Sequence, residues 1–124
     1  MSWLSEYAAR FHRSNGARRP GSQVVYCVSE GPGSPVKIGV TAGLDIRFRQ
    51  LQVHTWRELT LHWAAEGYSM HECALKQLSA GRTIHGEWFH DPDDRLKGLL
   101  CGRDRSEAEL VTAIAALASS EAAA

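Results

Sequence analysis

The sequence predicts an α+β domain in which a small three-stranded antiparallel sheet is flanked by helices. Residues 24–28 (VVYCV) and 36–41 (VKIGVT) are short runs rich in branched residues, and the turn-forming stretch EGPGSP separates them. A third run, residues 58–66, alternates in the β sense, and segments with helical spacing follow the second and third runs. The resulting ββαβα order, with helices added at both ends, suits an antiparallel sheet covered by helices.

Length and composition are those of one ordinary globular domain. The 124 residues can enclose a single core. No apolar run approaches the roughly 18 residues of a membrane span, so we expect no contact with a membrane. The first residues lack the apolar segment of a secretory signal. The three cysteines, Cys27, Cys73 and Cys101, are odd in number and far apart, which favours reduced thiols in a cytoplasmic protein.

The charge is unevenly distributed, although the formal net charge is zero. The first 20 residues carry four arginines against one glutamate, whereas residues 91–124 lean acidic. A neutral total argues against broad non-specific binding of nucleic acid, because that affinity comes from neutralised phosphates. A local basic patch is still compatible with a neutral total.

Residues 1–20 are expected to form an amphipathic helix followed by a basic linker. Trp3, Tyr7 and Phe11 recur at helical spacing on one face. We expect this face to pack on the core. The alternative is a surface that binds a partner or dimerises, because aromatic residues are enriched among interface anchors. The linker SNGARRPGS is either solvated or touches a phosphate backbone through Arg18 and Arg19.

The hairpin formed by the first two runs lies at the centre of the predicted core, residues 21–100. Its apolar residues share one face if odd positions pair with even ones, for example Val25 with Ile38. Side chains alternate along a strand, so the same register places Tyr26 and Lys37 together on the opposite face. Gly39 leaves room for a close approach to the backbone.

The helix after the hairpin, from about Leu44 to His54, carries an arginine at the margin of its apolar stripe. The stripe consists of Leu44, Phe48 and Leu51. Arg47 lies at its margin, where the stem is held by packing while the guanidinium stays accessible. Arg49 points outward. The plain alternative is that the stem of Arg47 only covers the edge of the core.

The third strand and the next helix complete the core. Leu59, Leu61 and Trp63 alternate and are expected to share a face. The helix from residue 69 to about residue 80 starts with a capping-box pattern, Ser69-x-x-Glu72, and Gly81 terminates it.

The C-terminal part of the chain is expected to add two helices. Residues 83–90 are irregular or extended, and a short helix covers residues 91–100 with Pro92 in its first turn. Residues 101–124 form a last helix and a tail that frays from residue 119. Ser106-x-x-Glu109 caps this helix. Its apolar side consists of Leu110, Ile114 and Leu117.

Four motifs occur in a fixed order along the chain. They are Tyr26 in VVYCV, Lys37-Ile38-Gly39 followed by Thr41, Arg47 in DIRFRQLQ, and Gly86-Glu87-Trp88-Phe89, with Glu72 in HECALKQL before the last. In this order they resemble the GIY-YIG nuclease superfamily. The closer likeness is to its small phage-type branch, in which the second motif reads KIG and a GEWF block follows. The resemblance covers roughly residues 23–90.

The resemblance implies metal-dependent hydrolysis of DNA phosphodiester bonds by water. It implies that Tyr26 activates or orients the water and that Arg47 clamps the phosphate, with Lys37 assisting. It also implies that Glu72 is the protein ligand of one Mg²⁺ or Mn²⁺. The side chains expected to contact DNA are Arg18, Arg19, Arg49 and Lys76.

Two departures from the fuller superfamily pattern keep other functions open. Leu51 stands where many members have histidine, and no asparagine matches the one that often follows the metal glutamate. Lys37 replaces a tyrosine but is normal for the phage-type branch. One alternative is a non-catalytic DNA-binding module on the same fold. The other is an interaction protein, a homodimer or a regulator of a protein partner, that uses its N-terminal or C-terminal helix.

The acidic candidates also have structural explanations. Glu72 fits a capping box, and it fits an i,i+4 ion pair with Lys76. Glu87 is either an anchor that binds backbone or a second acidic ligand. The six histidines complete no zinc motif, because Leu75 interrupts the HExxH pattern that begins at His71. His54 is the one histidine placed as a spare acid or base.

Overall fold

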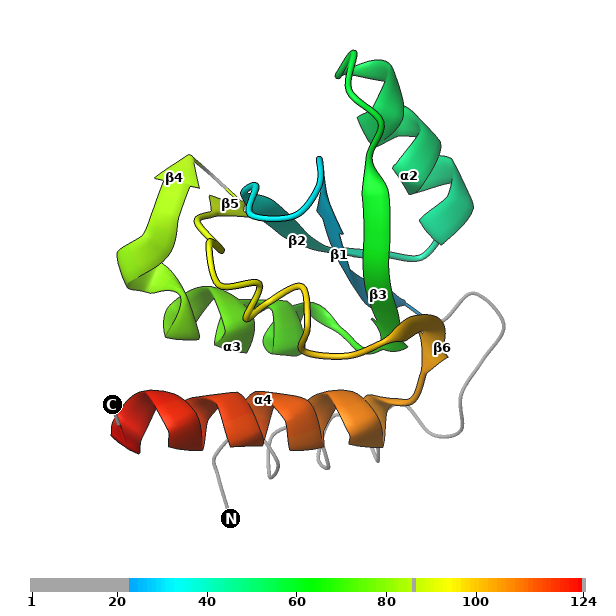
Figure 1. Cartoon of the computed structure of the whole chain (residues 1–124). Helices are drawn as coiled ribbons and strands as arrows, with labels where there is room; N and C mark the ends of the chain where they lie inside the picture. Colours follow the sequence, from blue (N-terminus) through cyan, green and yellow to red (C-terminus); the bar gives the residue numbers. More distant parts are fainter. Residues whose placement is uncertain (1–22, 86, 124) are drawn as a thin grey trace.

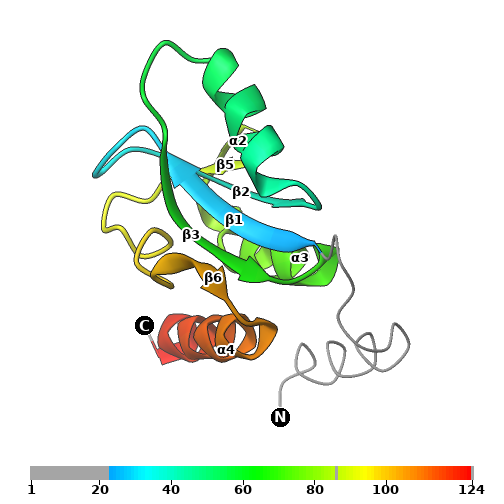
Figure 2. The same cartoon turned by 90° about the vertical axis from the view of Figure 1, so that its right-hand side faces the viewer.

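The computed structural model of the chain describes residues 23–85 and 87–123. The predicted N-terminal helix and basic linker, including Arg18 and Arg19, lie outside the described residues. The described part is a mixed α+β structure in which a sheet separates two layers of helix. Figures 1 and 2 show α2 on one face of this sheet, with α3 and α4 on the other.

The described residues form six strands, three α-helices and one short 3₁₀ helix, joined by loops. They are β1 Val24–Ser29, β2 Val36–Thr41, α2 Leu44–Val53, β3 Thr60–Glu66, α3 Ser69–Leu78, η1 Ala80–Arg82, β4 Thr83–His85, β5 Trp88–Phe89, β6 Gly102–Arg105 and α4 Glu107–Ala123. The strand order across the sheet is β4-β5-β2-β1-β3-β6.

The α+β class is confirmed, whereas the prediction of a three-stranded sheet is wrong. β5 pairs antiparallel with β2, β4 pairs with β5, and β6 adds to β3 in parallel. These additions use the backbone groups that a three-stranded sheet would leave unpaired at both edges. Each added strand has two to four residues, too few for an alternating pattern to be visible in the sequence.

The central hairpin has the predicted faces but a different partner for each residue. Val25 lies opposite Val40, and Ile38 lies opposite Cys27, so the predicted pairing of Val25 with Ile38 is wrong by two residues. The parity of the register is unchanged, and Tyr26 and Lys37 therefore still share one face.

A bulge in β3 changes which side chains enter the core. Cys27 lies opposite Trp63 but Val28 lies opposite Leu61, so His62 is the extra residue of β3. Trp63 consequently enters the main core, while Leu61 packs on the opposite face with Tyr26. The prediction that Leu61 and Trp63 share a face is wrong for this reason.

Two apolar clusters of unequal size lie on the two faces of the sheet. The larger one lies between the sheet and the helices α3 and α4 and includes Trp63, Leu75 and Leu110. The smaller one, which we call the α2 cluster, consists of Tyr26, Val28 and Ala64 with Leu44, Phe48, Leu51 and Leu61 packed against them. The predicted stripe of α2 therefore covers the face that carries Tyr26.

Residues 91–100 form a turn-rich loop, and the short helix predicted there is absent from this described segment. The buried carboxylate of Asp91 accepts hydrogen bonds from the backbone N–H groups of Leu96 (2.9 Å) and Lys97 (3.0 Å). An aspartate that bonds nearby backbone groups offers the chain an alternative to a helix. The ammonium of Lys97 also donates to the carbonyl of Ser34 at 2.6 Å, which ties the loop to the β1–β2 turn.

The two C-terminal helices begin differently. The N-cap of α3 is Tyr68, whose N–H donates to His71 Nδ1 at 2.9 Å, so the predicted capping box of Ser69 and Glu72 is wrong. The box predicted for α4 is confirmed, because the N–H of Glu109 donates to the Ser106 hydroxyl at 3.1 Å. The helix continues to residue 123, beyond the predicted start of fraying.

The apolar stripe of α4 is used inside the molecule. Leu110, Ile114 and Leu117 are buried in the main core, as predicted. This stripe is therefore not free to dimerise.

Cys27, Cys73 and Cys101 are all free thiols. Across residues 23–85 and 87–123, no helix is long and apolar enough to cross a membrane.

The buried His71 makes the stability of the fold sensitive to acid. Burial lowers the pKa of His71 from its ordinary value of 6.5 to about 4. Between these values the unfolded chain binds more protons than the folded one, so the free energy of unfolding falls as the pH falls. We expect a loss of roughly 2 kcal/mol between pH 6.5 and pH 5, measured by urea unfolding.

The variant His71→Asn is the control for this pH dependence. An asparagine keeps an acceptor near the Tyr68 N–H but does not titrate, so the variant is expected to lose less stability on acidification. Equal losses in the two proteins would contradict the assignment of the acid sensitivity to His71.

Candidate functional site

The ring of Tyr26 lies directly on the backbone of β2 at Gly39. A Cβ atom at position 39 would lie 2.3 Å from the Tyr26 hydroxyl oxygen and 2.5 Å from Cζ. Only glycine fits opposite this ring, and the space predicted at Gly39 is filled by the phenol. The side chain of Tyr26 is consequently buried, with the residue 2% exposed.

Arg47 reaches the same point from helix α2. Its Nε donates a hydrogen bond to the Tyr26 hydroxyl at 3.4 Å, and its Nη1 donates to Gln50 Oε1 at 3.4 Å. The helix is held there by the α2 cluster, in which Phe48 packs beside Tyr26. The structure thus brings together Tyr26 and Arg47, which are 21 residues apart in the sequence.

Lys37, Glu87, Lys76 and Glu72 form a row of alternating charges, which we call the Lys37–Glu72 ladder. Lys37 Nζ lies 2.6 Å from Glu87 Oε2, and the other oxygen of Glu87 lies 3.2 Å from Lys76 Nζ. Lys76 Nζ in turn lies 3.1 Å from Glu72 Oε1. The predicted i,i+4 pair of Glu72 and Lys76 is confirmed.

The ladder shifts the titration of its half-buried members. Partial burial alone would raise the pKa of Glu87, but the hydrogen bonds and charges of Lys37 and Lys76 outweigh it and lower that pKa. Desolvation would lower the pKa of Lys76, but Glu72 and Glu87 outweigh it and raise that pKa. Both shifts favour the charged forms of Glu87 and Lys76.

Glu87 is the residue of this site whose role the sequence did not predict. The GEWF block offered an anchor for backbone or a second acidic ligand, whereas the structure places Glu87 between two lysines. The pairing joins residues 50 positions apart, and β5 creates it by adding to the edge of β2. A lysine in KIG followed by a glutamate in GEWF was the available signal.

The donor set for a metal ion is small. In the described part of the chain, no group of three or more histidine, cysteine, aspartate and glutamate side chains could hold a metal. Glu72 and Glu87 are the two carboxylates that meet, at Lys76. Mg²⁺ is commonly held by one or two carboxylates, with water and substrate phosphate completing its octahedron. Lysines already pair with both oxygens of Glu87 and with Oε1 of Glu72, so an ion held by this pair would have to take the place of the Lys76 ammonium.

A pocket of about 230 Å³ opens beside Lys37. It is lined by Val28, Glu30, Lys37, Leu51, His54, Thr55, Leu59 and Trp88. The ammonium of Lys37 lies 6.0 Å from the centre of the Trp88 ring. Leu51 gives this pocket an apolar wall, and His54 lies at the same pocket.

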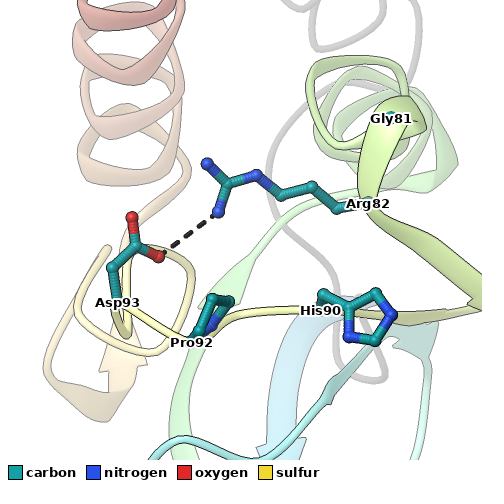
Figure 3. A pocket seen from close by; sticks show the side chains of 5 residues that line it. All are labelled: Gly81, Arg82, His90, Pro92 and Asp93. Carbon is teal, nitrogen blue, oxygen red and sulfur yellow. Dashed lines mark hydrogen bonds and ion pairs between the residues drawn. The ribbon is translucent and has the colours of Figure 1, made fainter.

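A wider hollow of about 450 Å³ lies elsewhere, at the end of α3. Figure 3 shows Arg82 and Asp93 pointing toward one another across it, and their ion pair spans 3.3 Å. Its lining contains none of the predicted site residues, so we do not connect it with the site. Of the predicted DNA contacts, Arg49 is exposed on α2 and Lys76 lies in the ladder.

Comparison of the chain with protein-family models, curated proteins and solved structures finds no match. The arrangement of Tyr26, Arg47 and the Lys37–Glu72 ladder is therefore the basis for the functional inference that follows.

The contact between Tyr26 and Gly39 predicts a selective loss of stability. We expect Gly39→Ala to cost at least about 1–3 kcal/mol, because its methyl group overlaps the phenol ring. Gly81→Ala is the control, since no atom lies within 4 Å of a Cβ there and its backbone is not left-handed. Urea unfolding of both variants measures the difference.

A double-mutant cycle assigns the loss to the ring. Tyr26→Ala removes the overlapping atoms, so Gly39→Ala should cost much less in that background than in the wild-type chain. Tyr26→Phe should bring less relief than Tyr26→Ala, because it removes the hydroxyl oxygen but leaves Cζ at 2.5 Å. Equal costs for Gly39→Ala and Gly81→Ala would contradict the packing described.

Proposed function

We propose that this chain is a metal-dependent endonuclease of the GIY-YIG type that hydrolyses DNA phosphodiester bonds. The observation that carries the proposal is the convergence of Tyr26, Lys37 and Arg47 from β1, β2 and α2 on one face of the sheet. Glu72 lies on α3, on the other face of the sheet, and is linked to Lys37 through Lys76 and Glu87. Free cysteines suit a reducing compartment, and we expect the protein to act in the cytoplasm.

Tyr26 and Arg47 supply complementary parts of the reaction. The hydrogen bond from Arg47 Nε occupies one lone pair of the Tyr26 hydroxyl, which keeps its proton and a second lone pair for a water. The terminal nitrogens of Arg47 are suited to a phosphate, whose two oxygens match the planar guanidinium. Charge that develops on the phosphate in the transition state then lies beside a fixed cation.

Lys37 and the two carboxylates supply the rest. Lys37 lies two residues before Gly39 on the same face, roughly 7 Å along the strand from the Tyr26 ring. Glu72 and Glu87 would hold a divalent cation in place of the Lys76 ammonium, which pairs with both of them here. When bound, such an ion neutralises phosphate charge and lowers the pKa of water. Lys76 offsets the repulsion between these two carboxylates and so keeps them close together.

The burial of Tyr26 favours a second candidate, a non-catalytic DNA-binding module. At 2% exposure, the tyrosine has almost no surface that a water or a phosphate can reach. In this second function its hydroxyl serves to position Arg47, and Arg47 binds phosphate without turnover. The two candidates share the same face and differ in whether a phosphodiester bond is broken.

Nicking of supercoiled plasmid with Mg²⁺, with Mn²⁺ or with EDTA tests the nuclease. We expect nicking that requires metal, and a loss of at least about 100-fold in Arg47→Ala and in Glu72→Gln, because each removes a group that acts on transition-state charge or metal. Arg82→Ala is the matched control, since it also removes an arginine but at the wider hollow, whose lining contains none of the predicted site residues.

The outcomes separate the two candidates. Full cleavage by Arg47→Ala would contradict the catalytic assignment. Absence of nicking in the wild-type chain, together with a gel shift that weakens as salt rises, would support the binding module instead.

A further inference from the structure

The loop between α2 and β3 presents a tryptophan to solvent. Trp56 is 88% exposed, and Val53, at the end of α2, is 81% exposed. Tryptophan is a highly buried residue on average, so an indole left almost fully in water needs an explanation. Figures 1 and 2 show this loop at the far end of α2 from the β2–α2 connection.

Hydrogen bonds hold the backbone on both sides of Trp56. The side chain of Gln52 donates to the carbonyl of Arg57 at 2.7 Å and accepts from the N–H of Leu59 at 2.8 Å. The hydroxyl of Thr55 accepts from the N–H of Arg57 at 3.2 Å and donates to Glu30 at 2.9 Å. The indole is thus presented by an ordered loop, which lowers the entropy cost of a contact.

A guanidinium lies against the exposed indole. Arg57 Cζ is 4.9 Å from the centre of the Trp56 ring, within the range of a cation–π contact. The pair combines an apolar ring with a positive charge. A nucleotide has the complementary combination, a flat base and a phosphate.

The charge around this loop also differs from that of the rest of the described chain. Seven of the ten described lysines and arginines are ion-paired with carboxylates: Lys37, Lys76, Arg82, Arg95, Lys97, Arg103 and Arg105. The other three are Arg47, Arg49 and Arg57, which all lie on α2 or the loop that follows it. The described arginines without an ion pair therefore lie on α2 and its loop, where Glu30, bonded to Thr55, and Glu58 are the neighbouring carboxylates.

We propose that Trp56 stacks on an unpaired base of a DNA strand while Arg57 contacts a phosphate of that strand. The inference rests on the proposed function and specifies its substrate: DNA with a single-stranded or unpaired region near the site. Helix α2 rises about 9 Å from Arg47 to Val53, so Trp56 contacts a base a few nucleotides from the phosphate at Arg47. Stacking on an aromatic side chain is independent of base sequence.

Tryptophan fluorescence tests the stacking without cleavage. The wild-type chain is titrated in EDTA and low salt with a 20-nucleotide dT strand and with a duplex of equal length. The chain has four tryptophans, and the fluorescence that comes from Trp56 is the difference in intensity between the wild-type chain and Trp56→Phe. We expect the dT strand to quench the fluorescence of Trp56 and the duplex to leave it unchanged.

Affinities of the variants separate stacking from a merely apolar contact. Trp56→Leu keeps an apolar side chain but has no ring, and we expect it to bind the dT strand at least about tenfold more weakly. Trp56→Phe should bind within about threefold of the wild-type chain. Equal binding by Trp56→Leu and the wild-type chain would overturn the inference.

Failure of this inference can be told apart from failure of the proposed nuclease. One outcome would overturn the stacking alone: plasmid is nicked, the dT strand does not quench Trp56, and Trp56→Leu binds that strand as tightly as the wild-type chain. Quenching without nicking would support the stacking and overturn the nuclease. Another outcome would identify a contact between copies of the chain and overturn the stacking. In it, light scattering gives the mass of two chains for the wild type and of one chain for Trp56→Leu, and DNA does not quench Trp56.

Discussion

The contact of the Tyr26 ring with the backbone of Gly39 is the constraint on which the candidate site depends. Because position 39 has no side chain, the phenol can lie across β2, and its hydroxyl then meets Arg47 Nε. The apolar stripe of α2, including Phe48, packs against the cluster that contains Tyr26 and holds the helix on this face. The lack of a side chain at Gly39 thus allows Tyr26 on β1 and Arg47 on α2 to meet over β2.

The opposite side of the sheet is fixed by a buried network of charge and backbone. Asp91 and Lys97 pair at 3.3 Å with almost no exposure, and the network also binds the backbone of Leu96 and Ser34. Trp63 donates to the carbonyl of Leu96 at 2.8 Å. A buried ion pair is weak evidence for stability, because desolvation offsets its attraction. Here it has a geometric effect, since it closes the loop of residues 91–100 over the core.

Local patterns in the sequence predicted what is local in the structure. The odd-to-even pairing of the hairpin predicted that Tyr26 and Lys37 share a face, and the apolar stripe of α2 predicted Arg47 at its margin. Periodicity located the three long strands, α2 and α4. It could not reveal β4, β5 and β6, whose two to four residues carry no period, or the bulge at His62, which depends on pairing with β1. The ladder also required β5 to be in place.

The distribution of charge is compatible with the proposed binding of DNA by a chain whose net charge is zero. Ion pairs neutralise the cations of the ladder and of the C-terminal half, so their field is short-ranged. In the proposed function, the arginines of α2 and its loop would contact phosphate. Phosphate contacts by Arg47, Arg49 and Arg57 would give limited affinity and a shallow salt dependence compared with proteins that neutralise many more. Discrimination would then come from geometry, through the guanidinium held at Tyr26 and the indole of Trp56 beside Arg57.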